Sequence, residues 1–362
     1  AIPLPADFVT WDAEAELEEK HLEGSLAIIH LAGAPIAEGR WTAKRKEQIL
    51  LSRTRSTEHL VAAVKRCKAP PQVFVGASAV GIYGDRSDEV LSEMSPAGEG
   101  FLADVCRLWE AAQGLFPGRS VMLRTGVVLG HGGALKKMLP PFRLGAGGRL
   151  GHGRQWMSWI HIDDLVNLYV FALENDYLRG PVNAVAPGTL TNRQFTVALS
   201  KALGVPAIIP VPRFALRLVF GEMSSVLFDS QRVTPQQALD VKFPFIHPDI
   251  RSALEDLVRP RGQAGGHLFE SYQWFPKGRS EVFDFFSKAE NLETITPPWL
   301  NFRILKMDRP RLEEGTLIDY KLRIKGVPAK WRTRISQWAP PNQFMDSQLR
   351  GPYALWDHVH RF

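Results

Sequence analysis

The chain has 362 residues, 45% hydrophobic and 23% charged, a composition typical of a globular protein with room for two domains. Scattered Lys and Arg give a net charge of only +6, which argues against nucleic acid as a partner and allows attraction of anionic small molecules. No apolar run reaches the roughly 18–20 residues of a membrane span, and two cysteines are too few for a disulfide framework or a structural zinc site. We therefore expect a cytoplasmic protein with no membrane partner and no metal.

The first 258 residues alternate short β-branched runs with helical patterns, which predicts a parallel α/β sheet. Strands are expected at 26–33, 72–84 and 120–130, and helices at 41–67 and 101–113. Sheets of this kind bind ligands at the carboxyl ends of their strands. Small side chains stand at those ends, namely Ala32, Gly33, Gly76, Ala77, Ser78 and Gly126.

The pattern changes after a glycine-rich loop at 144–154 and an amphipathic helix that follows it. Residues 188–258 are mainly helical, with a strand-like stretch at 207–212, and predict a small subdomain. The segment 259–266 holds one Pro and three Gly without an apolar anchor, which is typical of a linker.

Residues 267–362 predict an α+β module of a different kind. Strands are expected at 267–276, 316–326 and 328–340, and they flank one helix at 277–295. In the last strand, Trp331, Thr333 and Ile335 are expected to point to one face of the sheet. Lys330, Arg332 and Arg334 are expected to point to the other, as in a half-buried antiparallel strand.

Several motifs of the first part resemble the epimerase-like branch of the extended short-chain dehydrogenase/reductase superfamily, the NAD-dependent epimerases and dehydratases. They are GASAVGIYGD (76–85), RTGVVLG (124–130), WMSWIHIDDL (156–165), NAVAPGTLTN (183–192) and the terminal segment 232–257. The resemblance implies a Rossmann-like, doubly wound parallel sheet over 1–187 and a small C-terminal subdomain over 188–258. It also implies NAD or NADP as cofactor and a nucleotide-linked sugar or another polar small molecule as substrate.

The family's chain opens with a strand, a G-x-x-G-x-x-G phosphate loop and a helix. The sequence here matches the family only from its third strand, FVTWDAEA, so we expect that the first βαβ unit is missing. The residues that distinguish NAD from NADP belong to that unit, which leaves the choice open.

The resemblance places cofactor contacts at the strand ends, on Ala32, Gly33, Gly76, Ala77, Arg124, Thr125, Gly126 and Val127. Arg124 could equally pair with Glu110 or Asp85. Gln155, Trp156 and Trp159 are expected to line the substrate pocket. His161 is expected to pack beside Asp163, and Asp163 to cap a helix rather than hold a metal.

The family's catalytic Tyr-x-x-x-Lys pair is replaced by Phe101 and Val105, neither of which carries a proton. Ser78 and Tyr83 are the candidate catalytic replacements. The alternatives are a Ser78 that caps its own backbone and a Tyr83 packed under its turn. A protein that binds a nucleotide or an apolar ligand without catalysis is the competing hypothesis.

Residues 267–362 resemble the helix-grip, START-like superfamily that includes polyketide cyclases and dehydrases, on the segments 291–305, 315–335 and 350–362. The resemblance implies an apolar ligand between a curved sheet and a helix, and a module that stops before its closing helix. Aromatic residues could line that cavity or form a plain core: Phe283, Phe285, Phe286, Trp299, Tyr320 and Trp331. A homodimer is a further expectation.

Overall fold

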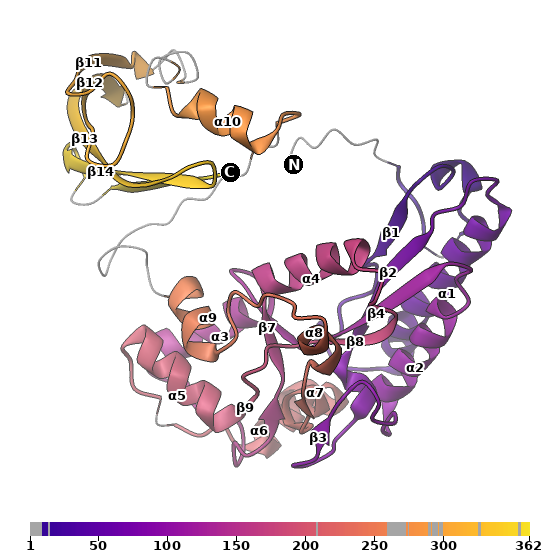
Figure 1. The fold of residues 1–362 in the computed structure, drawn as a ribbon. Coiled ribbons are helices and arrows are strands. Elements are labelled where there is room, and N and C mark those ends of the chain that lie inside the picture. Colours follow the sequence, from indigo (N-terminus) through magenta and orange to yellow (C-terminus); the bar gives the residue numbers. More distant parts are fainter. Residues whose placement is uncertain are drawn as a thin grey trace. The chain divides into compact units, whose positions relative to one another are not determined.

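The computed structural model divides the chain into two compact units, which span residues 9–259 and 260–362 (Figure 1). The predicted linker at 259–266 and most of the predicted strand at 267–276 lie outside the described residues. Those described are 9–13, 15–207, 209–258, 273, 275–288, 291, 296, 300–324, 327–353 and 356–362.

A parallel four-stranded sheet forms the centre of the first unit, as predicted. Its order is β1 (Ala27–His30), β2 (Val73–Ala79), β4 (Arg119–Thr125) and β8 (Gly180–Ala184). All three neighbouring pairs run parallel, so the carboxyl ends of these strands share one edge.

Helices cover both faces of this sheet. Figure 1 shows α1 (Ala43–Arg66) and α2 (Phe101–Gln113) on one side and α4 (Ile162–Glu174) on the other. Both helices predicted at 41–67 and 101–113 are confirmed. A doubly wound sheet of this kind must bury side chains on both faces.

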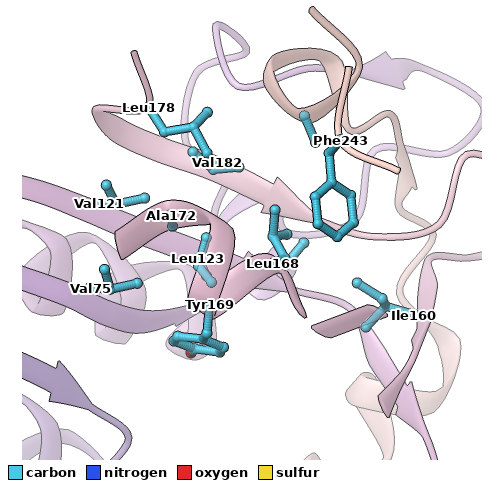
Figure 2. Packing of buried hydrophobic residues seen from close by; sticks show 12 residues of the cluster. Val75, Val121, Leu123, Ile160, Leu168, Tyr169, Ala172, Leu178, Val182 and Phe243 are labelled. Carbon is cyan, nitrogen blue, oxygen red and sulfur yellow. The ribbon is translucent and has the colours of Figure 1, made fainter. Parts of the chain in front are cut away.

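Residues of β2 alternate between these two layers. Phe74 packs among Leu60, Val61 and Val64 of α1, whereas Val75 faces α4. Figure 2 shows the second layer, in which sheet residues meet α4 side chains: Val75, Val121 and Leu123 against Leu168, Tyr169 and Ala172. Successive side chains of β2 therefore point to opposite faces of the sheet, and both faces are buried.

Shorter elements complete the first unit. The strand pairs are β3 (Val90–Leu91) with β10 (Arg232–Val233), β5 (Val127–Leu129) with β7 (Trp159–His161), and β6 (Trp156–Met157) with β9 (Leu190–Thr191). The helices are η1 (Glu19–His21), η2 (Val80–Tyr83), α3 (Gly133–Arg143), α5 (Asn192–Leu203), α6 (Arg213–Phe220), η3 (Gly221–Ser224), α7 (Ser225–Phe228), α8 (Gln236–Asp240) and α9 (Ile250–Leu257). Among the described residues, no helix has the length and apolarity to cross a bilayer.

Two sequence expectations in this unit need correction. The strand predicted at 120–130 is broken at Gly126 into β4 and β5, because the chain there passes the Ser158 carbonyl so closely that a Cβ would lie 2.7 Å from it. The stretch 207–212 forms no strand in its described part. Only Val211 makes an isolated bridge, since Pro210 and Pro212 have no N–H for a ladder.

An antiparallel sheet makes up most of the described part of the second unit. Its strands follow chain order: β11 (Arg303–Met307), β12 (Leu317–Ile324), β13 (Val327–Ala339), β14 (Gln343–Arg350) and β15 (Asp357–Arg361). The predicted alternation of β13 is confirmed, with Trp331, Thr333 and Ile335 buried and their basic neighbours exposed.

The predicted helix at 277–295 is present as α10 (Arg279–Phe286), which ends before Ser287, and most of 289–295 lies outside the described residues. Its Phe283 is buried against the rings of Trp338, Phe344 and Phe362. Elsewhere in the unit, Tyr320 stacks on Trp331. These ring contacts agree with the packed-core alternative for Phe283, Tyr320 and Trp331, whereas Phe285 is 41% exposed and Trp299 lies outside the described residues.

Candidate functional site

A pocket of about 390 Å³ opens at the carboxyl ends of β1, β2 and β4. Five predicted site residues line it: Ala32, Gly33, Ala77, Ser78 and Thr125. The strand ends carry small side chains here, which leave space between them and the larger side chains of α1, α2 and α4. This is the arrangement that lets a flat ligand approach strand ends closely.

Arg53 of α1 also lines this pocket, and the sequence analysis missed it. Its guanidinium lies over the Trp109 ring at 5.2 Å and donates to the carbonyl of Ile49 at 2.9 Å. Among the described residues, no carboxylate forms an ion pair with it, and burial lowers its pKa. The pocket therefore contains a cation that an anionic ligand would neutralise.

Gly33 allows this cation to lie against the strand end. A Cβ at Gly33 would stand 3.0 Å from Cζ of Arg53, which is closer than ordinary packing allows. A larger side chain at Gly33 would therefore displace Arg53 or occupy the pocket.

Ser78 and Tyr83 belong to one buried polar network. Ser78 Oγ donates to Oε1 of Glu110 at 2.6 Å, and Arg124 binds both carboxylate oxygens of Glu110 at 2.8 Å. The Tyr83 hydroxyl accepts from Arg124 at 2.9 Å and lies 2.7 Å from Oδ1 of Asn183. The network links α2 to β2, β4 and β8 beneath the pocket.

This network decides two open alternatives. Arg124 is buried and pairs with Glu110, as the second alternative predicted, and its role as a cofactor contact stays a prediction. Tyr83 is fully buried, and burial raises its pKa, the effect being reduced by Arg124. Its surroundings support the packed alternative over a proton donor, because the hydroxyl is already committed to protein partners.

Three other predicted cofactor residues do not line the pocket. Gly76 makes room for Gln113, whose amide donates to the carbonyl of Ala77. Gly126 allows the close approach to Ser158 described above, and Val127 pairs with Trp159 in the short β5–β7 ladder. The two glycines therefore allow close packing of neighbouring groups, and Val127 is part of a strand pair.

The residues predicted to contact substrate lie elsewhere too. Trp159 is fully buried in the core, and its indole N–H donates to the carbonyl of Gly188. Buried Gln155 donates to the carbonyls of Leu150 and Leu227, and Trp156 stacks under Arg232. None of the three lines either of the two pockets described here, so their role as substrate contacts stays a prediction.

A second hollow, of about 670 Å³, lies on the other side of Leu102, which lines both pockets. The first turn of α2 separates the two, with Phe101 in the larger pocket and Val105 in the smaller. The larger pocket also contains Arg213 and Arg217 of α6. Among the described residues, neither arginine forms an ion pair.

Asp229 lines the larger pocket and has the most strongly perturbed carboxyl there. Burial, with added repulsion from Asp85, raises its pKa to about 6, and Arg213 opposes the shift. A carboxyl that titrates near neutrality in a cleft is suited to proton transfer. No local motif marks Asp229 in the sequence.

The His161 segment is organised differently from the expectation. His161 itself is the N-cap of α4, and its Nδ1 accepts from the N–H of Asp163 at 3.1 Å. The buried carboxylate of Asp164 accepts from the N–H groups of Ile246 and His247. His161 and Asp164 therefore tie the start of α4 to the residues before α9.

Comparison with known proteins agrees with this geometry. Residues 6–184 match the family described as "NAD dependent epimerase/dehydratase family", and residues 211–257 match a domain of unknown function, DUF1731. Epimerase family protein SDR39U1 of Mus musculus is 41% identical over 258 residues, which are 69% of this chain and 87% of the relative. Epimerase family protein YfhF of Bacillus subtilis is 37% identical, over 70% of this chain and 85% of the relative.

Solved structures give the same result. Human epimerase family protein SDR39U1 (isoform 2), crystallised with NADPH, superposes with a TM-score of 0.63 at 36% identity, covering 65% of this chain and 82% of that chain. The nucleoside-diphosphate sugar epimerase of Corynebacterium glutamicum gives a TM-score of 0.55 at 33% identity, covering 68% of this chain and 48% of that chain.

Proposed function

Because the chain belongs to the NAD-dependent epimerase/dehydratase family, as a relative of the SDR39U1 proteins, we propose that it is an NADPH-binding oxidoreductase or epimerase. The observation that carries this proposal is the pocket at the ends of β1, β2 and β4, with its small side chains at the strand ends and with Arg53, which has no carboxylate partner in the described part of the chain. The human relative's NADPH supports NADP over NAD.

The pocket suits one part of a dinucleotide. Ala32, Gly33 and Ala77 leave room for a flat group against the strand ends, and Arg53 supplies a positive charge for a phosphate. In a reduction NADPH would supply the hydride, and in an epimerisation NADP⁺ would take the hydride from the sugar and return it. Ser78 donates its proton to Glu110, so toward a ligand it acts as a hydrogen-bond acceptor.

The larger pocket is the proposed substrate site. Arg213 and Arg217 favour an anionic substrate, and a nucleotide-linked sugar carries such charge on its phosphates. The sugar epimerase of C. glutamicum supports this choice. Phe101 and Val105 cannot transfer protons, so Asp229 is the proposed proton-transfer group.

An NADPH titration of the full-length protein tests the cofactor site. Arg53→Ala should weaken binding about 10- to 100-fold, since a charge-assisted hydrogen bond contributes about 1.5–3 kcal/mol. Arg55→Ala is the matched control, because Arg55 lies exposed on the same helix. Equal affinities for the two variants would contradict the assignment of Arg53.

The competing proposal is a protein that binds NADPH without catalysis, which Phe101 and Val105 of α2 favour, because neither side chain can transfer a proton. Two assays with a panel of nucleotide-linked sugars separate the two proposals. Oxidation of NADPH reports a reductase, and interconversion of the sugars in the presence of NADP⁺, which an epimerase would not consume, reports an epimerase. Turnover that is lost in Asp229→Asn, with NADPH affinity retained, supports the enzyme. Binding without turnover of any panel member supports the competing proposal.

For the second unit we keep the proposal of a helix-grip module that binds an apolar ligand, supported by one helix beside an antiparallel sheet and by half-exposed Phe285 and Trp356. Saturable binding of an apolar fluorescent probe, lost in Trp356→Ala, is the expected result.

We also propose a homodimer, supported by exposed Leu108 and Leu115 at α2 and testable by light scattering. A cytoplasmic location agrees with the free thiols of Cys67 and Cys106.

A further inference from the structure

Three side chains with metal-ligating atoms gather on one face of the second unit's sheet. His358 and His360 are separated by one residue on β15, and alternate residues of a strand point to the same face. Asp346 of β14 stands directly opposite His358 in the antiparallel register. The pairing of β14 with β15 therefore brings two imidazoles and one carboxylate together.

The distances are close to those of a coordination site. Oδ1 of Asp346 lies 3.5 Å from Nδ1 of His358 and 3.8 Å from Nε2 of His360. One ligand atom from each of the three residues lies within 4.8 Å of the other two. Ligand atoms around a tetrahedral zinc ion, with bonds of about 2.0–2.2 Å, are about 3.3–3.6 Å apart. Small side-chain rotations would close this difference.

Neighbouring side chains hold the ligands in place. The hydroxyl of buried Thr333 lies 3.0 Å from Oδ2 of Asp346, which leaves Oδ1 directed at the imidazoles. The ring of Phe344 stacks on His360 with centroids 4.3 Å apart. In known metal sites, neighbouring groups of this kind fix the orientation of the side chains that bind the metal.

We propose that Asp346, His358 and His360 bind a divalent transition-metal ion such as Zn²⁺. Two imidazoles and one carboxylate form a ligand set that suits such ions and leaves coordination positions open. The side chain of His358 is 52% exposed, so water can reach the ion from that side. The expectation of no metal depended on the cysteines and the His161 segment, and neither reports on the pairing of β14 with β15.

A second His/Asp cluster, in the first unit, is less suited to binding a metal ion. It combines His161, Asp163, His247 and Asp256. Nδ1 of His161 already accepts from the N–H of Asp163, so the proton of the neutral ring is on Nε2, which faces Asp256 at 3.5 Å. An Nε2 that carries a proton cannot ligate a metal, so His161 cannot complete a site in this cluster through that atom. His247, a histidine of the same cluster, therefore serves as the control position.

Metal content of the full-length protein tests the proposal. The protein is prepared without a polyhistidine tag, stripped with a chelator, equilibrated with Zn²⁺ and analysed by mass spectrometry of the metal. Co²⁺ in place of Zn²⁺ then reports ligand geometry by visible absorption. We expect about one ion per chain in the wild type and in His247→Ala.

The double variant His358→Ala/His360→Ala should lose the ion. His358→Ala alone removes a half-exposed side chain, so it should fold normally and still weaken binding by at least about 100-fold. Thr333→Val should weaken it about 10- to 100-fold, the usual effect of removing a group that supports a ligand. Absence of stoichiometric metal in the wild type, equal binding by the double variant, or loss in His247→Ala would overturn the proposal.

Discussion

The Glu110→Ala variant tests whether the buried network beneath the small pocket holds the first unit together. Glu110 and Arg124 have side-chain exposures of 12% and 9%, and two bonds of 2.8 Å join them. Removal of the carboxylate leaves a buried guanidinium without its counter-charge, which costs about 3–5 kcal/mol. In a unit of this size each kcal/mol lowers Tm by about 2–4 °C, so we expect a loss of about 6–20 °C.

Differential scanning calorimetry of the full-length protein measures this loss in the transition of the first unit. Asp104→Ala is the control, since Asp104 pairs with Arg107 on the same helix at 2.6 Å, but both side chains are about 60% exposed. An exposed pair contributes about 0–1 kcal/mol. The double variant Glu110→Leu/Arg124→Met should recover most of the stability, because it removes both charges. A Glu110→Ala variant no less stable than Asp104→Ala would refute the reasoning.

Two further predictions concern Tyr83 and Asp229. Tyr83→Phe should lower stability by about 1–3 kcal/mol, because Asn183 and Arg124 lose a buried partner, while NADPH affinity stays unchanged; turnover abolished at full stability would show instead that Tyr83 is the acid. The pKa of Asp229, raised to about 6 from 3.8, means that the folded chain binds this proton more tightly than the unfolded chain, so the group's contribution to stability falls as pH rises from about 4 to 6. Asp229→Asn should therefore be more stable than wild type at pH 7.5 and nearly equal at pH 4 in thermal unfolding, and a less stable variant at pH 7.5 would contradict the shift.

Periodicity in the sequence predicted three of the four strands of the central sheet and the helices that cover it, whereas β8 (Gly180–Ala184) was missed. The apolar runs before Gly33, Ser78 and Gly126 are strands whose ends meet at one edge, and α2 begins at Phe101 as expected. Such patterns record which face of an element is buried, and a parallel sheet then follows from the alternation of strands with helices.

The residues that line the pockets were harder to predict. A sequence pattern shows that a side chain is buried, but it does not show whether that side chain faces the core or a pocket. Trp159 and Gln155 were assigned to the substrate pocket, yet both are core residues. Arg53 carried a usable signal, since it stands four residues after Ile49 and seven before Leu60, on the buried stripe of α1. Asp229 carried none, because its pKa depends first on burial and then on Asp85, which lies 144 residues earlier in the chain.

Hydrogen exchange of the full-length protein, with and without saturating NADPH, tests most directly whether the cofactor occupies the ends of β1, β2 and β4. We predict slower exchange in the peptides that contain residues 31–36, 77–79 and 102–109, which border the small pocket, and no change in 316–350 of the second unit. NADPH that binds without slowing exchange in the first three segments, or that protects the second unit instead, would contradict the account.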